Sequence, residues 1–196
     1  MDQKTFIFFG PSGSGKGTQA TLLQNYLKEK DGKKVIYIET GARFRDFIEE
    51  ANYTSQLTEK ILKEGGLLPS FLPVWIWTNY LIRHFTGNEH LILDGVCRRA
   101  SEAPVLDSAI KFYKIAKPVV LSINLSRAVS KQRMMGRGRS DDTEEYIESR
   151  LDWYDKEVTP VIEYYKGNPD YSFLEINGEN SVEEVQKEII DKISKI

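Results

Sequence analysis

The residues from Gly10 to Lys16 have the spacing of a phosphate-binding loop. The stretch reads GPSGSGK, with glycine at its first, fourth and sixth places and the lysine at its end. In the pattern G-x-x-x-x-G-K, backbone N–H groups surround phosphate oxygens and the lysine reaches the terminal phosphates. The bland alternative is a glycine-rich turn with a solvated lysine. An apolar run before the loop and a helical pattern after it favour the phosphate site.

A set of arginines along the chain is suited to gathering around two phosphate-bearing molecules. Phosphoryl transfer requires that two polyanions be aligned and that the charge on the moving group be neutralised. Guanidinium groups bind phosphate oxygens bidentately and stay charged throughout. The candidates are Arg45, Arg98, Arg133, Arg137, Arg139 and Arg150. For Arg99 and Arg127 a surface ion pair is an equally good reading, because such pairs are common.

Asp94 follows the apolar residues LIL and precedes Gly95, so we expect it at the carboxyl end of a buried strand. Ligands of open α/β sheets bind at that edge, and a carboxylate there can hold Mg²⁺ through its water shell, with Thr18 as a second oxygen. Alternatively, Asp94 caps the next helix. Asp141 and Asp142 precede a long helical pattern, and we expect them to help seat the neighbouring arginines.

Five short apolar runs separated by helical patterns must position these side chains. The runs are Thr5–Phe9, Val35–Glu39, His90–Asp94, 118–125 and 171–176. Strands that are apolar on both faces and alternate with helices predict a parallel sheet covered on two sides. The exception is the segment 40–84, where three amphipathic stretches at 43–51, 55–64 and 70–84 follow without a strand and predict a helical insertion. A glycine-rich and charged link at 135–142 precedes a long helix expected at 143–165.

Composition restricts the class of protein. The chain has 196 residues, and 40% of them are hydrophobic, which suits one compact domain. Its 27 basic and 29 acidic residues give a net charge of -2, so we expect no nucleic-acid or membrane partner. The single cysteine, Cys97, cannot form an internal disulfide, and the polar start lacks a signal segment. These features predict a cytoplasmic protein.

Several motifs together resemble those of the adenylate kinases and related nucleoside monophosphate kinases. They are GPSGSGKGTQ at 10–19, TGARFR at 40–45, LDGVCRR at 93–99, GRGRSDD at 136–142 and SRL at 149–151. The resemblance covers almost the whole chain and is to the short-lid form. It implies an α/β, three-layer P-loop fold with a central five-stranded parallel sheet. It also implies one domain, 1–196, with a core (1–41, 85–135 and 143–196), a nucleoside monophosphate (NMP) lobe at 42–84 and a short lid at 136–142, usually as a monomer.

The resemblance also implies a reaction, MgATP plus AMP to two ADP, and a role for each matching residue. The expected ATP-binding residues are Gly13, Ser14, Gly15, Lys16, Gly17, Thr18, Arg133, Arg137 and Asn180. The expected monophosphate-binding residues are Thr40, Arg45, Gly66, Leu67, Leu68, Gly95, Arg98, Glu102, Arg139 and Arg150. The expected catalytic residues are Lys16, Arg98, Arg137, Arg139 and Arg150. The implied cofactor is Mg²⁺, at Asp94 and Thr18.

Glu102 is a departure from the family pattern, which has glutamine at this place. A carboxylate only accepts hydrogen bonds, so it would meet adenine N1 with a lone pair, whereas guanine offers N–H groups. An alternative is therefore a nucleoside monophosphate kinase that prefers GMP or a pyrimidine monophosphate. Ala42 also replaces an aspartate, and Val96 and Cys97 replace Phe-Pro. From a different class, a P-loop NTPase switch or a nucleotide-binding protein remains an alternative.

Overall fold

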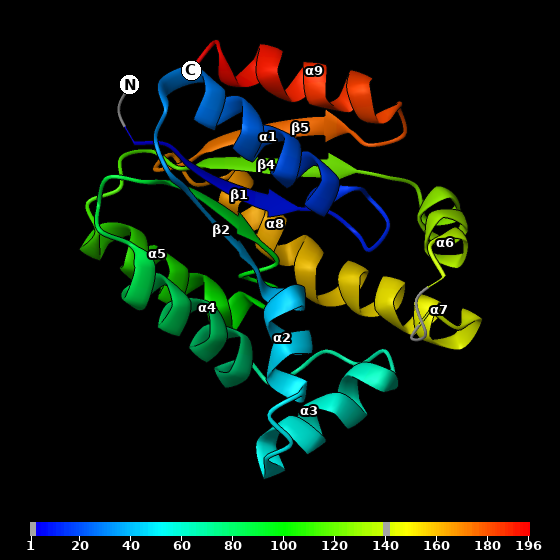
Figure 1. Cartoon of the computed structure of the whole chain (residues 1–196). Helices are drawn as coiled ribbons and strands as arrows, with labels where there is room; N and C mark the ends of the chain where they lie inside the picture. Colours follow the sequence, from blue (N-terminus) through cyan, green and yellow to red (C-terminus); the bar gives the residue numbers. More distant parts are fainter. Residues whose placement is uncertain (1–2, 139–141) are drawn as a thin grey trace.

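Five parallel strands form the centre of the molecule. The structure is a computed structural model that describes residues 3–138 and 142–196. The strands are β1 (Thr5–Phe9), β2 (Val35–Glu39), β3 (His90–Asp94), β4 (Val119–Asn124) and β5 (Ser172–Asn177). They lie side by side in the order β2-β3-β1-β4-β5 and all pair in parallel (Figure 1). The predicted five-stranded parallel sheet is confirmed.

Helices cover both faces of the sheet, and the alternation along β1 shows why. Phe6 and Phe8 pack in one buried cluster with side chains of α1 (Lys16–Asp31) and α9 (Val182–Ile193). Ile7 and Phe9 point to the opposite face, where α4 (Phe71–His84), α5 (Ala103–Phe112) and α8 (Thr159–Lys166) cover them. Because successive side chains of a strand alternate between faces, a strand apolar throughout needs two helical layers. The three-layer arrangement is confirmed (Figure 1).

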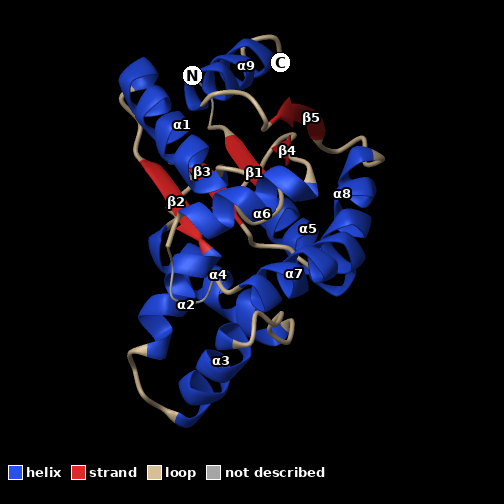
Figure 2. Ribbon diagram, turned by 90° about the vertical axis from the view of Figure 1, so that its right-hand side faces the viewer, coloured by secondary structure: helices blue, strands red, loops and turns tan. Residues whose placement is uncertain are grey.

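The connection from β2 to β3 contains three helices and no strand, as the sequence predicted. They are α2 (Thr40–Ile48), α3 (Tyr53–Lys63) and α4. Helix α2 begins directly after β2, three residues earlier than the amphipathic pattern indicated. Figure 2 shows α2 and α3 standing away from the sheet as an arm. A small apolar cluster joins this arm to the start of α4; it contains Phe44, Phe47, Leu68, Leu72 and Ile76.

The connection from β4 to β5 contains α6 (Arg127–Gly136) and α7 (Glu144–Trp153). A π-helical turn, η2 (Tyr154–Val158), joins α7 to α8, so the long helix predicted at 143–165 exists with this interruption. Helices α6 and α7 lie side by side, and Arg127 of α6 reaches carboxylates of α7 and η2. Arg127 thus makes surface ion pairs. No helix in the described ranges is long and apolar enough to cross a membrane.

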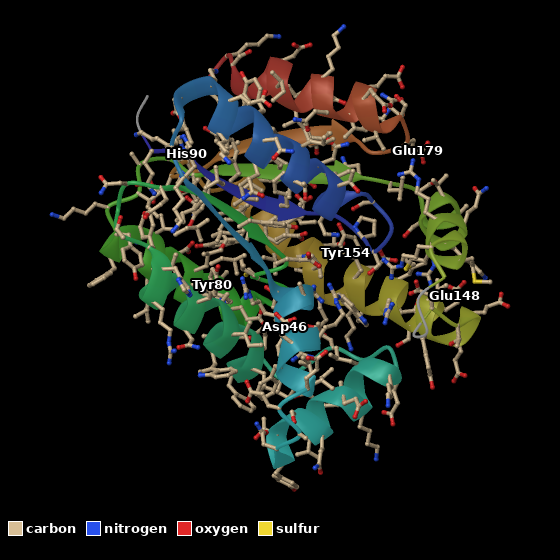
Figure 3. The ribbon with its side chains drawn as sticks, in the orientation of Figure 1. Asp46, Tyr80, His90, Glu148, Tyr154 and Glu179 are labelled. Atoms are coloured by element: carbon tan, nitrogen blue, oxygen red, sulfur yellow. The ribbon has the colours of Figure 1, made fainter. Side chains whose placement is uncertain are left out.

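His90 has a structural role at the other end of the sheet. It is fully buried, its Nδ1 accepts a hydrogen bond from the Lys4 backbone N–H at 2.9 Å, and its Nε2 lies 3.0 Å from Asp31 Oδ2. Since Nδ1 is an acceptor, Nε2 carries the proton and donates to the carboxylate. Figure 3 shows His90 far from Glu148 on α7. The imidazole therefore fastens the N-terminal segment to α1 and takes no part in the site below.

Candidate active site

The carboxyl ends of three strands meet at one edge of the sheet and bring the predicted site residues together. In the register of the sheet, Asp94 of β3 lies beside Phe8 of β1 on one side and beside Glu39 of β2 on the other. The segments that leave these strands carry the glycine-rich loop, the TGARFR motif and the LDGVCRR motif. Parallel pairing thus makes neighbours of motifs that are separated widely along the chain.

The glycine-rich loop runs from β1 into α1, which begins at Lys16. Gly13 has φ +85°, and a Cβ atom there would lie 2.8 Å from the carbonyl oxygen of Ser130 in α6. Only glycine fits so close a backbone contact. Ser130 is fully buried and donates from its hydroxyl to the carbonyl of Ser12 at 2.5 Å. Helix α6 therefore fixes the shape of the loop.

Lys16 points back over the loop. Its Nζ donates to the carbonyl oxygens of Gly10 at 2.7 Å and Pro11 at 3.0 Å. Burial lowers the pKa of Lys16 to about 8, while the Asp94 carboxylate raises it and the guanidinium groups of Arg98 and Arg137 lower it further. The Lys16 ammonium thus lies near the guanidinium groups of Arg98 and Arg137, and a bound phosphate would neutralise this local positive charge.

Asp94 lies at the floor of the cleft with 6% of its surface exposed. The Tyr37 hydroxyl donates to its Oδ2 at 3.4 Å. Burial raises the pKa of Asp94, and Lys16 and Arg98 oppose that rise. The following 3-10 turn, η1 (Ala100–Glu102), has no side-chain cap, so the alternative in which Asp94 caps the next helix is wrong.

Two adjoining cavities open at this edge of the sheet. The larger, about 710 Å³, is lined by the loop, Lys16, Asp94 and a set of arginines. The smaller, about 310 Å³, is lined by residues of α2, of the α3–α4 loop, of α7 and by arginines. We call them the loop compartment and the arm compartment. Arg45, Arg98 and Arg137 line both compartments, so three guanidinium groups lie where the two meet.

Most of the predicted site residues line these compartments. In the loop compartment are Gly13, Gly15, Lys16, Gly17, Thr18, Arg45, Asp94, Arg98, Arg133 and Arg137. In the arm compartment are Thr40, Arg45, Gly66, Leu67, Leu68, Arg98, Arg137 and Arg150. Neither lining includes Ser14, Gly95, Glu102 or Asn180. Arg139 lies outside the described residues.

Four predicted residues sit beside the compartments. Ser14 is buried in the loop, 3.5 Å from Lys16 Nζ. Gly95 has φ +70°, and the Arg98 guanidinium lies directly over it. Asn180 belongs to the turn after β5, where Arg133 donates to the carbonyl of Gly178 at 2.8 Å. The fourth residue, Glu102, is oriented in a way that the sequence did not reveal.

Glu102 is directed at the backbone and not into the arm compartment. It is 1% exposed, and its Oε2 accepts a hydrogen bond from the Arg98 backbone N–H at 2.7 Å. Its Oε1 has no hydrogen-bond partner within the described ranges. The carboxylate therefore supports the turn that carries Arg98.

Asp142 joins two of the site arginines. Its side chain is 1% exposed, and its Oδ1 accepts hydrogen bonds from Arg137 and Arg150, each at 2.8 Å. Arg137 also donates from Nε to Oδ2. A buried carboxylate that neutralises two guanidinium groups fixes their planes toward the cleft. The structural role predicted for Asp142 is thus visible in these bonds, whereas Asp141 lies outside the described residues.

Sequence reasoning missed contributors that carry no motif. Arg99 donates to backbone carbonyls of the α3–α4 loop and lies 3.8 Å from Glu157, so it is more than a surface ion pair. Trp153 lines the arm compartment and donates to the same loop. Its spacing of three residues from Arg150, which places both on one helical face, was the available signal. Burial raises the pKa of the Cys97 thiol, in agreement with the packing role expected for it.

Comparisons with known proteins agree with this arrangement. The family model described as Adenylate kinase matches residues 8–169. An adenylate kinase of Corynebacterium urealyticum is 31% identical over 189 residues, covering 96% of this chain and 98% of the relative. An adenylate kinase of Azobacteroides pseudotrichonymphae is 33% identical over 193 residues, covering 96% of each chain. One from Prochlorococcus marinus is 31% identical over 190 residues, with 96% and 97% covered. Since these matches span the loop, the shared arginines and both compartments, the chain belongs to the adenylate kinase family.

Proposed function

We propose that the protein catalyses the reversible transfer of a phosphoryl group from MgATP to AMP, which yields two ADP. The observation that carries this proposal is the sharing of Arg45, Arg98 and Arg137 by two adjoining compartments. A protein that only hydrolyses or senses one nucleotide needs one phosphate site. Two sites with guanidinium groups between them suit a donor and an acceptor whose phosphates must meet.

The donor phosphates would lie on the glycine-rich loop, where backbone N–H groups and the start of α1 favour anions. Lys16 would leave the carbonyls of Gly10 and Pro11 for the phosphate oxygens. Arg133, which is already bonded to the Gly178 carbonyl, would offer its flat face to the donor base, near Asn180. The loop compartment would thus take MgATP.

The acceptor would lie in the arm compartment. Arg45 and Arg98 would hold its phosphate, and Gly66, Leu67 and Leu68 would line its base. Arg137 and Arg150, oriented by Asp142, would neutralise the group in transfer, together with Arg139. No general base is required, because the acceptor phosphate is already an anion and positioning supplies most of the catalysis.

The residues at the cleft floor fit a magnesium ion held mainly by substrate phosphates and water. Asp94 is a buried carboxylate that lines the same compartment as the Thr18 hydroxyl, and both offer oxygen ligands. Within residues 3–138 and 142–196, no cluster of three or more His, Cys, Asp or Glu side chains could hold a metal alone. When bound, Mg²⁺ neutralises phosphate oxygens of the donor. Asp94 and Thr18 would hold it through its water shell.

We further propose a division of labour among the segments. The core would comprise residues 1–41, 85–135 and 143–196, with an acceptor lobe at 42–84 and a lid at 136–142. Closure of the lobe and the lid over both nucleotides would exclude water and so prevent wasteful hydrolysis of ATP.

The test is a coupled assay with MgATP and, in turn, AMP, GMP, CMP, UMP and dTMP. AMP should give the highest kcat/KM, and a molecule that joins two adenosines through a phosphate chain should inhibit by filling both compartments. Lys16→Met should reduce turnover by about 10²- to 10³-fold. Faster turnover with another monophosphate would refute AMP as the acceptor. Steady ATP hydrolysis that needs no monophosphate would refute the transferase.

A further inference from the structure

Two side chains of the core fasten the α3–α4 loop. Trp153 donates from Nε1 to the carbonyl of Gly65 at 3.0 Å. Arg99 donates from Nη1 to the carbonyl of Leu68 at 2.8 Å and from Nη2 to that of Leu67 at 3.3 Å. These bonds run from the end of α7 and from the β3–α5 connection to a loop of the arm. They therefore tie parts of the protein that lie far apart in the sequence.

The loop also touches α7 directly. Gly65 has φ +69°, and a Cβ atom on it would lie 2.9 Å from the carbonyl oxygen and 3.0 Å from the Cβ of Tyr146. No side chain fits between these two backbones, so the loop and the helix are in close contact. The hydrogen bond from Trp153 forms beside that contact, and the position of the loop is determined at more than one point.

Trp153 connects this loop to the phosphate-binding arginine as well. The Arg98 guanidinium carbon lies 5.7 Å from the centroid of the Trp153 ring, within the range of a cation–π contact. One indole thus contacts the loop through its N–H and Arg98 through its face. Arg98 and Arg99 are adjacent in the sequence but make different contacts. Arg98 lines both compartments, whereas Arg99 donates to the α3–α4 loop.

We propose that Trp153 and Arg99 are positioning residues for the acceptor nucleotide. They hold the α3–α4 loop at the separation from Arg98 that the base and the phosphate of one monophosphate require. This inference rests on the proposed function, in which the arm compartment takes AMP. Because the α3–α4 loop is held in place before the nucleotide binds, binding does not carry the entropic cost of ordering the loop. The affinity for the acceptor is higher by that free energy.

Trp153 and Arg99 should influence binding of the acceptor nucleotide and not binding of the donor. Trp153 and Arg99 do not line the loop compartment, whose described residues belong to the glycine-rich loop, α1, β2, α2, β3 and the arginines. Loosening the α3–α4 loop should therefore weaken acceptor binding and leave donor binding unchanged. Once AMP is bound, Arg98, Arg137 and Arg150 still surround the moving group, so kcat should be preserved.

The experiment is steady-state kinetics with each substrate varied at saturating levels of the other. Trp153→Phe keeps an aromatic face for Arg98 and removes the N–H donor. Arg99→Met keeps the aliphatic stem and removes both donors. Each variant should raise the KM for AMP about two- to tenfold, the value of a lost hydrogen bond, with kcat and the KM for MgATP within about twofold of wild type. Arg99→Lys, which can still donate to one carbonyl, should recover part of the loss.

The matched control is Trp75→Phe. Trp75 lies on α4, where its ring contacts Phe47 of the arm; it is 45% exposed and undergoes the same chemical change. Its KM values should equal those of wild type. Intrinsic fluorescence gives a second readout: AMP alone should alter the emission of wild type and of Trp75→Phe, and the change should be lost in Trp153→Phe.

The outcomes separate this inference from the proposed function. An unchanged KM for AMP in both variants, or an equal rise in both KM values, would overturn the positioning role. If Trp153→Phe failed to fold, Arg99→Met would decide alone. Wild-type protein that did not phosphorylate AMP at all would refute the proposed function instead.

Discussion

Glu102 Oε2 accepts the backbone N–H of Arg98 at 2.7 Å, so the residue that departs from the family pattern supports the residue that lines both compartments. Glu102→Leu should leave this N–H without an acceptor and lower the free energy of unfolding by about 1 to 3 kcal/mol. Glu102→Gln keeps an acceptor oxygen and should be at least as stable as wild type. Urea unfolding followed by circular dichroism measures both, and equal stability of the two variants would contradict the bond's importance.

Lys16 should impose an alkaline limit on catalysis. Its pKa is lowered to about 8 by burial, and the cationic form is the one that binds phosphate. As the pH rises through about 8 the ammonium loses its proton, so kcat/KM for MgATP should fall by about tenfold per pH unit above that value. Saturating MgATP raises the pKa of Lys16, so kcat should decline only at higher pH. Lys16→Arg should be slower and should lack the decline, because a guanidinium stays charged.

Asp142 lines neither compartment, but its substitution should lower kcat. Asp142→Ala removes the carboxylate that orients Arg137 and Arg150, and kcat should fall about 10- to 100-fold. The control is Asp155→Ala, which breaks only an exposed ion pair with Arg127 and should leave kcat within about twofold. Similar rates for the two variants would show that the arginines find their positions without Asp142.

Alanine substitutions at Gly65 and Gly32 should distinguish the cost of backbone strain from the cost of a steric clash. Both have a left-handed φ, +69° and +72°, but a Cβ on Gly65 would collide with Tyr146 whereas one on Gly32 meets nothing within 4 Å. Gly32→Ala should cost about 1 kcal/mol of stability from strain alone. Gly65→Ala should cost more than that and should raise the KM for AMP, because the loop must move away from α7. Thermal unfolding and AMP kinetics of the pair test this, and matching losses of stability would contradict it.

The sequence predicted the sheet closely, because each strand is a continuous apolar run between turn residues. Thr5–Phe9, Val35–Glu39 and His90–Asp94 have the predicted bounds, and the other two strands differ by one residue at each end. The early start of α2 was not predictable from amphipathicity, since its first two residues, Thr40 and Gly41, are not apolar. The π-helical turn at Tyr154–Val158 has no local signature in composition, because it depends on packing between helices.

The common location of the motif residues at one edge of the sheet was predictable, and the contacts between distant segments were not. Asp94 ends β3 and Lys16 lies at the end of the loop that follows β1, and the register of these two strands brings them together, so spacing was enough. The orientation of Glu102 was missed because the helical spacing from Arg98 predicts a shared face, whereas the carboxylate turns back to the Arg98 backbone. The spacing of Trp153 from Arg150 places it on the face of the site. Its contact with the α3–α4 loop, like that of Arg99, joins distant segments, and no pattern along one segment reveals such a contact.

The strand order has a consequence for synthesis of the protein on the ribosome. β1 is translated first, yet it is the middle strand, flanked by β3 and β4. The nascent glycine-rich loop therefore emerges long before the strands and the Ser130 hydroxyl that give it its shape. Nucleotide can protect the growing chain only after Asn124 and the helix that follows have left the exit tunnel. Until β3 has emerged the apolar β1 has no strand to pair with, and an exposed apolar strand of this kind is prone to aggregation.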